Sequence, residues 1–290
     1  MEINMNGKLY IVATPIGNLK DISQRALEIL ESADLIAAED TRNTQALLNH
    51  FGIHKKLVAN HKFNERNVVD SLVSQLLSGM NIAVVSDAGT PCVNDPGYVL
   101  AKASWEAGVE VVAIPGACAA VTAVSASGLP SASFAFKGFF PREKKDAISL
   151  IDTIREGGEE LYIFYESPMR IINTIGLLKD NLPESTLCLC NDLTKLHERI
   201  YRGTPENVWA LLNDNPNATK GEYCLLVYMP PLTRKTEKDE LLSPEAYLVD
   251  YVVKHGCTMK EAISALALNK TLSYTKKDFY NASLRLKEEF

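Results

Sequence analysis

The chain has 290 residues, of which 46% are hydrophobic, so it is long enough to bury a sizeable core and to form two domains. Its formal net charge of -6 excludes a generally basic nucleic-acid-binding protein, and any RNA contact must use a local basic patch. No run approaches the roughly 20 apolar residues of a membrane-spanning helix. No basic segment precedes a long apolar one near the N-terminus. We therefore expect a cytoplasmic protein with no membrane partner.

Strands and helices alternate through the first half of the chain. The apolar run at 9–13 predicts the first strand, and Asp21 with Gln24 three residues later indicates a capping box for the helix that follows. Further strands are predicted at 34–38, 82–85 and 109–114, and further helices at 44–49, 66–77, 96–107 and 117–127.

The stretch from Ser86 to Gly97 organises this half of the chain. It follows a buried strand and precedes a helix for which Asp95 is the expected N-cap and Pro96 the first residue. Open α/β sheets bind ligands at the carboxyl ends of their strands, which is where this loop places Asp87. The alternative is an ordinary turn in which Asp87 serves only as a cap.

Two other loops of small residues, at 14–18 and 115–120, also follow predicted strands. Three such loops predict one pocket that is lined largely by backbone, because small residues let a ligand approach the main chain closely. Neither a G-x-G-x-x-G motif nor a P-loop is present, so a Rossmann dinucleotide site and a nucleotide triphosphate site are not supported.

The pattern restarts after Gly128–Ser131, a plausible hinge. Strands are predicted at 134–140, 161–165, 186–190 and 223–228, with helices at 143–156, after Ser167-Pro168 and after Thr204-Pro205. Strands that alternate with helices throughout indicate an α/β protein. We expect one α/β domain over 1–130 and a second over 131–232.

A small helical appendage is expected at 240–290, beyond a polar linker at 230–239. Helix starts are predicted at Ser243-Pro244, at Thr258 with Glu261, and at Thr275 with Asp278. From residue 254 to 287 the appendage is locally basic, with Lys254, Lys260, Lys270, Lys276, Lys277, Arg285 and Lys287 against Glu261 and Asp278. The default interpretation of these charges is a solvent-exposed helix face. The alternative is a module that contacts RNA.

The six cysteines contain no C-x-x-C pair. Two of them, Cys188 and Cys190, alternate with leucines in a predicted strand, where one face is expected to be core. This spacing favours free, buried thiols in a reducing compartment rather than disulfides, and we predict no metal site.

Five motifs occur in an order that resembles one family. They are ATPIGNLKDIS at 13–23, AAEDTR at 37–42, SDAGTP with NDPG within 86–97, IPGACAA at 114–120 and FYESP at 164–168. Across residues 7–230 they resemble the tetrapyrrole-methylase superfamily, and within it the ribosomal RNA small subunit methyltransferase I branch.

The resemblance implies a fold, a cofactor and a reaction. It implies two α/β domains with S-adenosyl-L-methionine (SAM) in the cleft between them, and a homodimer. The implied reaction is 2′-O-methylation of a cytidine ribose in 16S ribosomal RNA near the decoding centre of the small ribosomal subunit. The cofactor site implied by the resemblance and the small-residue loops contains Pro15, Gly17, Asp87, Gly89, Thr90, Pro115, Gly116, Cys118, Ala119, Tyr165 and Gly221.

Methyl transfer to a ribose hydroxyl depends mostly on alignment, with help from a general base. We expect the candidates for this catalytic role to be Asp40, Glu166 and Lys195. Glu39 and Asp40 are adjacent on an extended segment, so at most one of them is expected to face the cleft. We expect the substrate to be bound by Arg42, His61, Arg142 and Arg170. Of these, Arg42 and Arg170 are expected to pair with phosphates of the substrate, as guanidinium groups do well.

Two positions depart from the family pattern and keep other functions open. Met169 stands where relatives often carry His, and Asn191 stands where we expect an Arg. One alternative is a sister enzyme that methylates carbon on a tetrapyrrole such as uroporphyrinogen or a precorrin, although the basic appendage argues against it. The other is a non-catalytic module that binds SAM or RNA.

Overall fold

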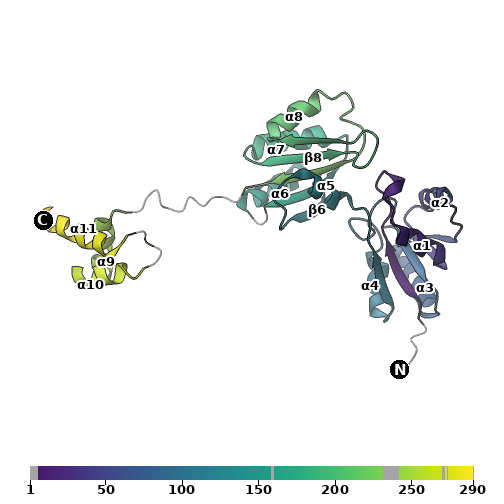
Figure 1. Cartoon of the computed structure of the whole chain (residues 1–290), viewed down its shortest axis with the longest axis horizontal. Coiled ribbons are helices and arrows are strands. Elements are labelled where there is room, and N and C mark those ends of the chain that lie inside the picture. The colour runs from purple at the N-terminus through teal and green to yellow at the C-terminus, as the bar shows by residue number, and fades with distance from the viewer. Residues whose placement is uncertain (1–5, 158–159, 231–241, 270–271, 273, 290) are drawn as a thin grey trace. The chain divides into compact units, whose positions relative to one another are not determined.

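The computed structural model describes residues 6–157, 160–230, 242–269, 272 and 274–289. The chain divides into two compact units, Met1–Pro230 and Pro231–Phe290 (Figure 1). The linker predicted at 230–239 lies, apart from Pro230, outside the described residues.

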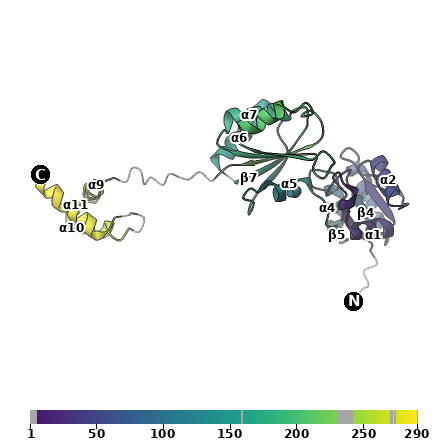
Figure 2. The same cartoon turned by 45° about the horizontal axis from the view of Figure 1, so that its top comes forward.

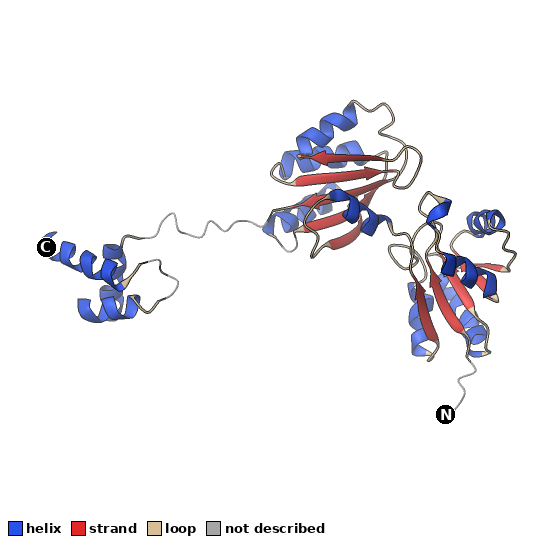
Figure 3. Cartoon of the chain, in the orientation of Figure 1, coloured by secondary structure: helices blue, strands red, loops and turns tan. Residues whose placement is uncertain are grey.

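The first unit contains two five-stranded sheets, and the first sheet is parallel throughout, in the order β3-β2-β4-β1-β5 (Figure 3). The elements of this sheet and its helices are β1 (Lys8–Val12), η1 (Leu19–Asp21), α1 (Gln24–Ser32), β2 (Leu35–Ala38), α2 (Thr41–His50), β3 (Leu57–Ala59), α3 (Glu65–Leu77), β4 (Ile82–Val85), α4 (Tyr98–Glu106) and β5 (Glu110–Ile114).

Helices cover both faces of this first sheet. Leu30 of α1 and Leu48 of α2 belong to the core on one face, whereas Leu72 of α3 and Leu100 of α4 belong to the core on the other. β2 and β4 are buried at every residue, as apolar runs between two layers of helices must be. After β1 the chain continues to β2, towards one edge of the sheet, whereas after β4 it continues to β5, at the opposite edge. The adjacent ends of β1 and β4 therefore form a topological switch point, where ligands bind in such sheets.

The second sheet has the order β6-β7-β10-β8-β9, and only its β6–β7 pair is parallel. The elements of this region are α5 (Ala119–Ser127), β6 (Ala135–Phe139), α6 (Lys144–Glu156), β7 (Leu161–Glu166), α7 (Ile171–Asn181), β8 (Thr186–Asn191), β9 (Arg199–Gly203), α8 (Pro205–Asn213) and β10 (Tyr223–Tyr228).

Helix α5 belongs to the second sheet by its packing. Ala120 and Ala123 lie in one core with Ile163 of β7 and Leu226 of β10, while α6 and α7 cover the opposite face (Figure 2). The chain thus reaches the second sheet before α5, upstream of the hinge expected at Gly128–Ser131. We propose 115–118 as the point at which the chain crosses between the two α/β lobes. The division at residue 130 remains a prediction.

The α/β fold class is confirmed, but two predicted helix starts were wrong. Ser23, not Asp21, caps α1, because its side chain accepts a hydrogen bond from the Ala26 amide, and Asp21 lies in the short 3-10 turn before it. Helix α4 begins at Tyr98 after Gly97, so Asp95 and Pro96 precede the helix.

Two further sequence readings of the second lobe differ from the structure. Helix α7 begins at Ile171, because the carbonyl of Ser167 accepts from the amides of Arg170 and Ile171 and closes a turn there first. Strand β9 was missed. It pairs only with β8 at the edge of the sheet and is largely exposed, so its residues carry no apolar pattern.

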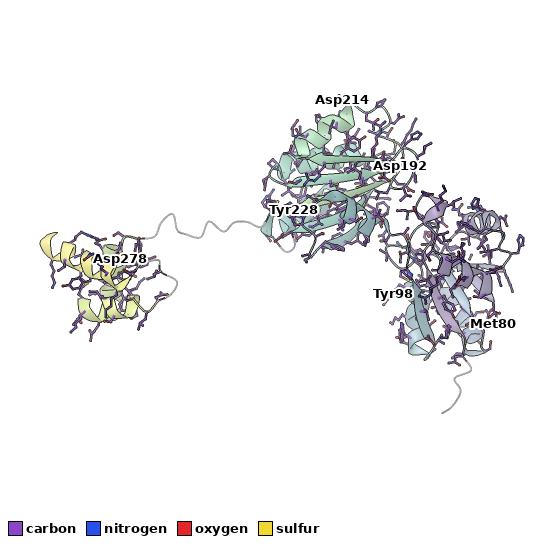
Figure 4. All side chains as sticks on the ribbon, in the orientation of Figure 1. Met80, Tyr98, Asp192, Asp214, Tyr228 and Asp278 are labelled. Carbon is purple, nitrogen blue, oxygen red and sulfur yellow. The ribbon has the colours of Figure 1, made fainter. Side chains whose placement is uncertain are left out.

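The second unit is a small helical body of α9 (Pro244–His255), α10 (Met259–Leu266) and α11 (Lys276–Glu289). Leu248, Ala262 and Phe279 are fully buried in its core. All three predicted helix starts are confirmed by their hydrogen bonds. These include the reciprocal bonds of Thr258 with Glu261 and of Thr275 with Asp278; Figure 4 labels Asp278. Among the helices that the structure describes, none combines the length and apolar character needed to cross a lipid bilayer.

Candidate functional site

A cavity of about 350 Å³ lies where the switch point of the first sheet meets the second sheet. Its volume is near the lower end of the range for small-molecule sites. The loop after β1, the loop after β4 and the start of α5 form one side, and strands β6, β7, β8 and β10 with their ends form the other. The lining residues are Ile16, Ala88, Gly89, Thr90, Val93, Asn94, Asp95, Cys118, Ala119, Phe139, Tyr165, Glu166, Ser167, Pro168, Cys190, Leu193, Glu222, Tyr223 and Cys224.

Backbone contacts hold the three small-residue loops together. The amide of Thr14 donates to the carbonyl of Gly89 at 2.8 Å, and the amide of Gly89 donates back at 3.1 Å. The hydroxyl of Thr90 donates to the carbonyl of Ala117 at 2.9 Å. Gly89 has a φ of +84°, which side chains rarely adopt, so the sequence needs glycine at this crossing. The three strand ends therefore form one wall, as the sequence predicted.

The loop from Thr90 to Gly97 is held in a strained conformation. Cys92 and Asn94 have φ values of +69° and +68°, in the left-handed region that costs energy for residues other than glycine. The buried carboxylate of Glu65 fixes one end of the loop by accepting from the amides of Gly97, at 2.8 Å, and Val99, at 3.2 Å. Strain of this kind persists only where the surroundings over-determine the backbone, so this loop is built to hold side chains in place.

Strands of the second sheet supply a neutral floor to the cavity. Cys224 lies directly opposite Tyr165 on one side and Cys190 on the other, so all three side chains share one face of the sheet. Burial raises the pKa of the Cys224 thiol to about 12 and also raises the pKa of the Tyr165 hydroxyl. A hydrogen bond with Cys188 is the main cause that raises the pKa of Cys190. These groups stay protonated near neutral pH, and all six cysteines are free thiols.

Glu166, at the end of β7, has no lone pair left for a substrate. Its carboxylate accepts from the Ser167 amide at 2.6 Å, from the Thr174 hydroxyl at 2.7 Å and from two nitrogens of Arg170 at 2.8 and 2.6 Å. Arg170 also donates to the carbonyl of Phe140 at 2.6 Å. The Glu166–Arg170 ion pair joins β6, β7 and α7 next to the cavity. Both side chains therefore have a structural role.

Lys195 lies beside the cavity in the loop that follows β8. Its ammonium group contacts Glu222 at 2.8 Å and Asp192, which Figure 4 labels, at 3.2 Å. Partial burial lowers the pKa of Lys195, but these hydrogen bonds and charges outweigh it and leave the pKa raised. A lysine that holds its proton is a poor general base.

Close backbone approach explains two of the predicted glycines. A β-carbon at Gly17 would lie 2.5 Å from the Cγ atom of Lys195, and one at Gly221 would overlap the carboxylate of Asp192. The amide of Asn18 also donates to the hydroxyl of Thr194 at 3.1 Å. These glycines let the loop after β8 dock on the rest of the site, although neither lines the cavity.

Asp40 and Asp87 hold the start of α2. Asp40 is the N-cap of α2, and its carboxylate accepts from the amide and the guanidinium of Arg42. The Arg42 hydrogen bonds hold the pKa of Asp40 at about 2. Asp87 accepts from the Asp40 amide at 3.0 Å and from the Asn43 side chain at 2.9 Å. The carboxylate of Asp40 is therefore ionised but engaged, and that of Asp87 joins two loops.

The structure brings together only part of the predicted site. Of the predicted cofactor residues, those that line the cavity are Gly89, Thr90, Cys118, Ala119 and Tyr165, and the lining also includes Glu166. The other predicted site residues are not among the lining residues, namely Pro15, Gly17, Asp87, Pro115, Gly116, Gly221, Asp40, Lys195, Arg42, His61, Arg142 and Arg170.

The predicted substrate residues differ in how free they are. Arg142 is exposed and follows Phe139 of the cavity by three residues, whereas Arg42 and Arg170 are paired with carboxylates. His61 stacks edge-on against Phe63, and its Nδ1 atom is buried without a hydrogen-bond partner. Among the described residues, Arg142 is exposed and forms no ion pair, so it is the one of these four that is both exposed and unengaged.

Several lining residues were missed by sequence reasoning. Asn94 and Asp95 lie in the loop that we singled out, but the NDPG motif resembled a helix cap. Phe139 is largely exposed, and Cys190 and Cys224 had the pattern of ordinary core residues. Asp95 could have been found from its position in the loop at the carboxyl end of β4, because such loops bind ligands in open α/β sheets.

The two positions that depart from the family pattern have simple structural environments. Met169 is 75% exposed in the turn after β7. Asn191 is buried, and its side chain donates weakly to the carbonyls of Lys220 and Glu222, at 3.5 and 3.4 Å. Asn191 thus fastens β8 to the segment before β10, which positions Glu222 in the cavity wall.

The residues of the cavity fit SAM, the cofactor that the resemblance implies. Small side chains at Ala88, Gly89 and Ala119 expose main-chain donors and acceptors, and Tyr165 and Phe139 offer ring faces. Among the described lining residues none is a lysine or arginine, so nothing opposes the positive charge of a sulfonium. In the described parts of the chain, no cluster of three His, Cys, Asp or Glu side chains could hold a metal ion.

These features define a two-lobed α/β protein with a ligand-sized cavity at the switch point of a parallel sheet. Residues 8–208 match the family model of tetrapyrrole (corrin/porphyrin) methylases, and the chain belongs to this family. The family model ends before the helical appendage. SAM, the methyl donor of this family of methylases, is confirmed as the cofactor.

The resemblance to one branch is confirmed by curated relatives. The chain is 42% identical over 282 residues to ribosomal RNA small subunit methyltransferase I of Haemophilus influenzae, which covers 97% of this chain and 98% of that protein. It is 48% identical over 225 residues to the protein of the same name from Escherichia coli O157:H7, across 77% of this chain and 78% of that protein.

Solved structures with low sequence identity share the fold. The crystal structure of diphthine synthase has a TM-score of 0.59 at 17% identity and covers 77% of this chain and 90% of that one. The uroporphyrin-III C-methyltransferase from Thermus thermophilus, complexed with S-adenosylhomocysteine, has a TM-score of 0.51 at 16% identity, with 77% and 97% covered. One fold thus serves acceptors of very different chemistry, so the acceptor must be inferred from more than the fold.

Proposed function

We propose that this chain transfers a methyl group from SAM to the ribose 2′-oxygen of a cytidine in 16S ribosomal RNA near the decoding centre. The observation that carries the proposal is the similarity over nearly the whole chain, appendage included, to proteins named for methylation of small-subunit ribosomal RNA. We propose further that the protein acts as a cytoplasmic homodimer on RNA within the small ribosomal subunit.

The protein's main task in this reaction is alignment. When bound, SAM supplies a methyl group on a positively charged sulfur, which is already a good leaving group. Holding the ribose hydroxyl in line with that methyl group supplies most of the acceleration. We assign the cofactor to the backbone of Gly89, Thr90 and Ala119 and to the faces of Cys118 and Tyr165.

The remaining predicted cofactor residues support this wall in our proposal. Pro15, Pro115 and Gly116 shape the loops behind it, and Asp87 ties the loop after β4 to α2. Gly17 and Gly221 admit the loop that carries Lys195. A β-carbon at Gly116 would lie 2.8 Å from the β-carbon of Ala13, so this glycine keeps the loops after β1 and β5 in contact.

We revise the catalytic candidates to positioning residues. The carboxylates of Asp40 and Glu166 are filled by hydrogen bonds, and Lys195 retains its proton. Lys195 instead fixes Glu222 at the cavity rim. Arg142 and Arg42, both exposed, remain our candidates for phosphate contacts. Arg170 is paired with Glu166 and His61 packs against Phe63, so we assign both a structural role.

The helical appendage is the proposed RNA arm. Lys254 pairs with Asp250 and Arg285 pairs with Glu245. Within the described part of the appendage, Lys260, Lys276, Lys277 and Lys287 are exposed and form no ion pair. Lys276 and Lys277 open α11, where the helix dipole disfavours positive charge. These two lysines therefore do not stabilise the helix, and contact with phosphates explains them better.

Replacing both Lys276 and Lys277 by glutamine in the full chain should weaken binding to small ribosomal subunits. Each lost phosphate contact lowers the slope of log affinity against log salt by about 1, so the double variant should lower it by about 2. SAM affinity, measured by calorimetry, should not change. The matched control is Lys55→Gln with Lys56→Gln, a pair that precedes the edge strand β3, which contributes no residue to the cavity lining. Equal slopes for the two double variants would remove the appendage from RNA binding.

The experiment that tests the acceptor compares two substrates in parallel. Purified protein receives SAM with a labelled methyl group and either small ribosomal subunits that lack the modification or uroporphyrinogen. We expect label in the RNA. Label in the tetrapyrrole would show that the branch is wrong, and SAM binding without transfer to either acceptor would favour a non-catalytic module.

A further inference from the structure

The proton acceptor of the reaction is not among Asp40, Glu166 and Lys195, because their contacts leave none of them free to take a proton. The other carboxylates of the cavity lining are Asp95 and Glu222. Glu222 is engaged by Lys195 at 2.8 Å. Asp95 differs from all of these, because within the described part of the chain its carboxylate makes no hydrogen bond and no ion pair.

The loop that carries Asp95 is hydrogen-bonded to the first lobe and packs closely against the second. On the first lobe, Glu65 holds the amide of Gly97, two residues after Asp95. On the second lobe, the side-chain oxygen of Asn94 lies so close to Gly138 that a β-carbon there would be 2.7 Å from it. Gly138 occupies the irregularity in β6, with a φ of +69°, which makes room for this contact. Asp95 thus lies at the junction of the two lobes, and among the described residues its carboxylate forms no hydrogen bond in that junction.

The charged and titratable groups around Asp95 are mostly acidic. Glu39 at the end of β2 and Asp87 at the end of β4 face it from the first lobe, and the Cys92 thiol lies in its own loop. The Tyr165 hydroxyl faces it from the second lobe. Burial, followed by the charges of Glu39 and Asp87, raises the pKa of Asp95 to about 6. A general base works best when its pKa lies near the working pH, so this environment suits proton transfer.

We propose that Asp95 is the general base that accepts the proton of the ribose 2′-hydroxyl. The proposal rests on the proposed function. A carboxylate oxygen of Asp95 takes the hydroxyl proton as the 2′-oxygen forms its bond to the methyl carbon. The bond between that carbon and sulfur breaks with its electron pair going to sulfur, so the products are the 2′-O-methyl ribose, S-adenosylhomocysteine and protonated Asp95. The proton then leaves to water, which restores the base.

The first test is the pH dependence of kcat at saturating SAM and small subunits. On the acid side of its pKa the carboxyl group is protonated and cannot accept a proton, so kcat of the wild type should fall about tenfold per pH unit there and level off on the basic side. Asp95→Asn should lower kcat at pH 7.5 by about 100-fold or more, within the range for loss of a general base, and should remove this limb of the profile. Asp95→Glu should restore part of kcat.

The second test needs no turnover. Carboxyl carbon-13 NMR of the protein without cofactor should show one aspartate that titrates near pH 6 and is missing from Asp95→Asn. Calorimetry should show that Asp95→Asn still binds SAM, so that a loss of kcat is not a loss of cofactor. The variant is expected to fold normally because the Asp95 side chain makes no hydrogen bond to any described residue. Asp70→Asn, on the exposed side of α3, is the matched control for an aspartate-to-asparagine change.

The outcomes separate the assignment of Asp95 from the proposed function. Full kcat, or an unchanged pH profile, in Asp95→Asn with an active wild type would overturn the assignment and leave the proposed function intact. So would a tenfold loss of SAM affinity with an unchanged kcat, because Asp95 would then be a binding residue. A wild type that transfers no methyl group to small subunits would overturn both.

Discussion

Replacing Arg170 by alanine is expected to destabilise the first unit by about 3–5 kcal/mol, the usual cost of removing one partner of a buried ion pair. The Glu166 side chain is fully buried, and two of its four hydrogen bonds come from Arg170. The variant would leave that carboxylate without its charge partner and would free the Phe140 carbonyl. Urea denaturation of the full chain, followed by near-ultraviolet circular dichroism, measures the change.

The control for Arg170→Ala is Lys102→Ala. Lys102 contacts Glu106 at 3.6 Å on the exposed face of α4, and surface pairs of this kind contribute about 0–1 kcal/mol. If Arg170→Ala costs no more than the control, the pair does not hold β6, β7 and α7 together. Glu166 would then become available again as a candidate base.

Replacing Ala119 by phenylalanine is expected to weaken SAM binding strongly while the protein stays folded. Ala119 is the first residue of α5 and lines a cavity of about 350 Å³, so a ring at this position would occupy space that a ligand needs. Overfilling a packed site costs about 1–3 kcal/mol, which corresponds to roughly 5- to 150-fold in Kd. Calorimetric titration with SAM measures this directly.

The matched control for Ala119→Phe is Ala126→Phe on the same helix. Ala126 is exposed and does not line the cavity, so its variant should bind SAM like the wild type. Equal affinities for the two variants would show that SAM does not bind against the start of α5. The assignment of Cys118 and Ala119 to the cofactor site would then be lost.

Much of the first lobe could be predicted because its pattern is local. Apolar runs such as Ile82 to Val85, buried on both faces, are typical of parallel strands, and small-residue loops at strand ends indicate a switch-point site. Gly89, Thr90, Cys118 and Ala119 were found in this way, together with the resemblance. The helix starts of the appendage were equally local, since each depends on residues three apart.

What could not be predicted depends on contacts between distant residues. The availability of a carboxylate is decided by its partners, and Thr174 and Arg170 fill Glu166 only once α7 packs beside β7. Among the described residues Asp95 has no hydrogen-bond partner, because the distant Glu65 accepts from the amides at the start of α4 in its place. Sequence spacing cannot distinguish the candidate carboxylates Asp40, Glu166, Glu222 and Asp95. In the folded chain the first three have hydrogen-bond partners, whereas Asp95 has none among the described residues.

The measurement that tests the account most directly locates the transferred methyl group within the RNA. Small-subunit RNA labelled from SAM is hydrolysed in alkali, which cleaves a strand only where the 2′-oxygen is free to attack the adjacent phosphate. The account predicts that the label appears in one alkali-resistant dinucleotide with cytidine at its 5′ side. Label recovered in a mononucleotide would place the methyl group on a base and would contradict ribose 2′-O chemistry, together with the need for Asp95 as its proton acceptor.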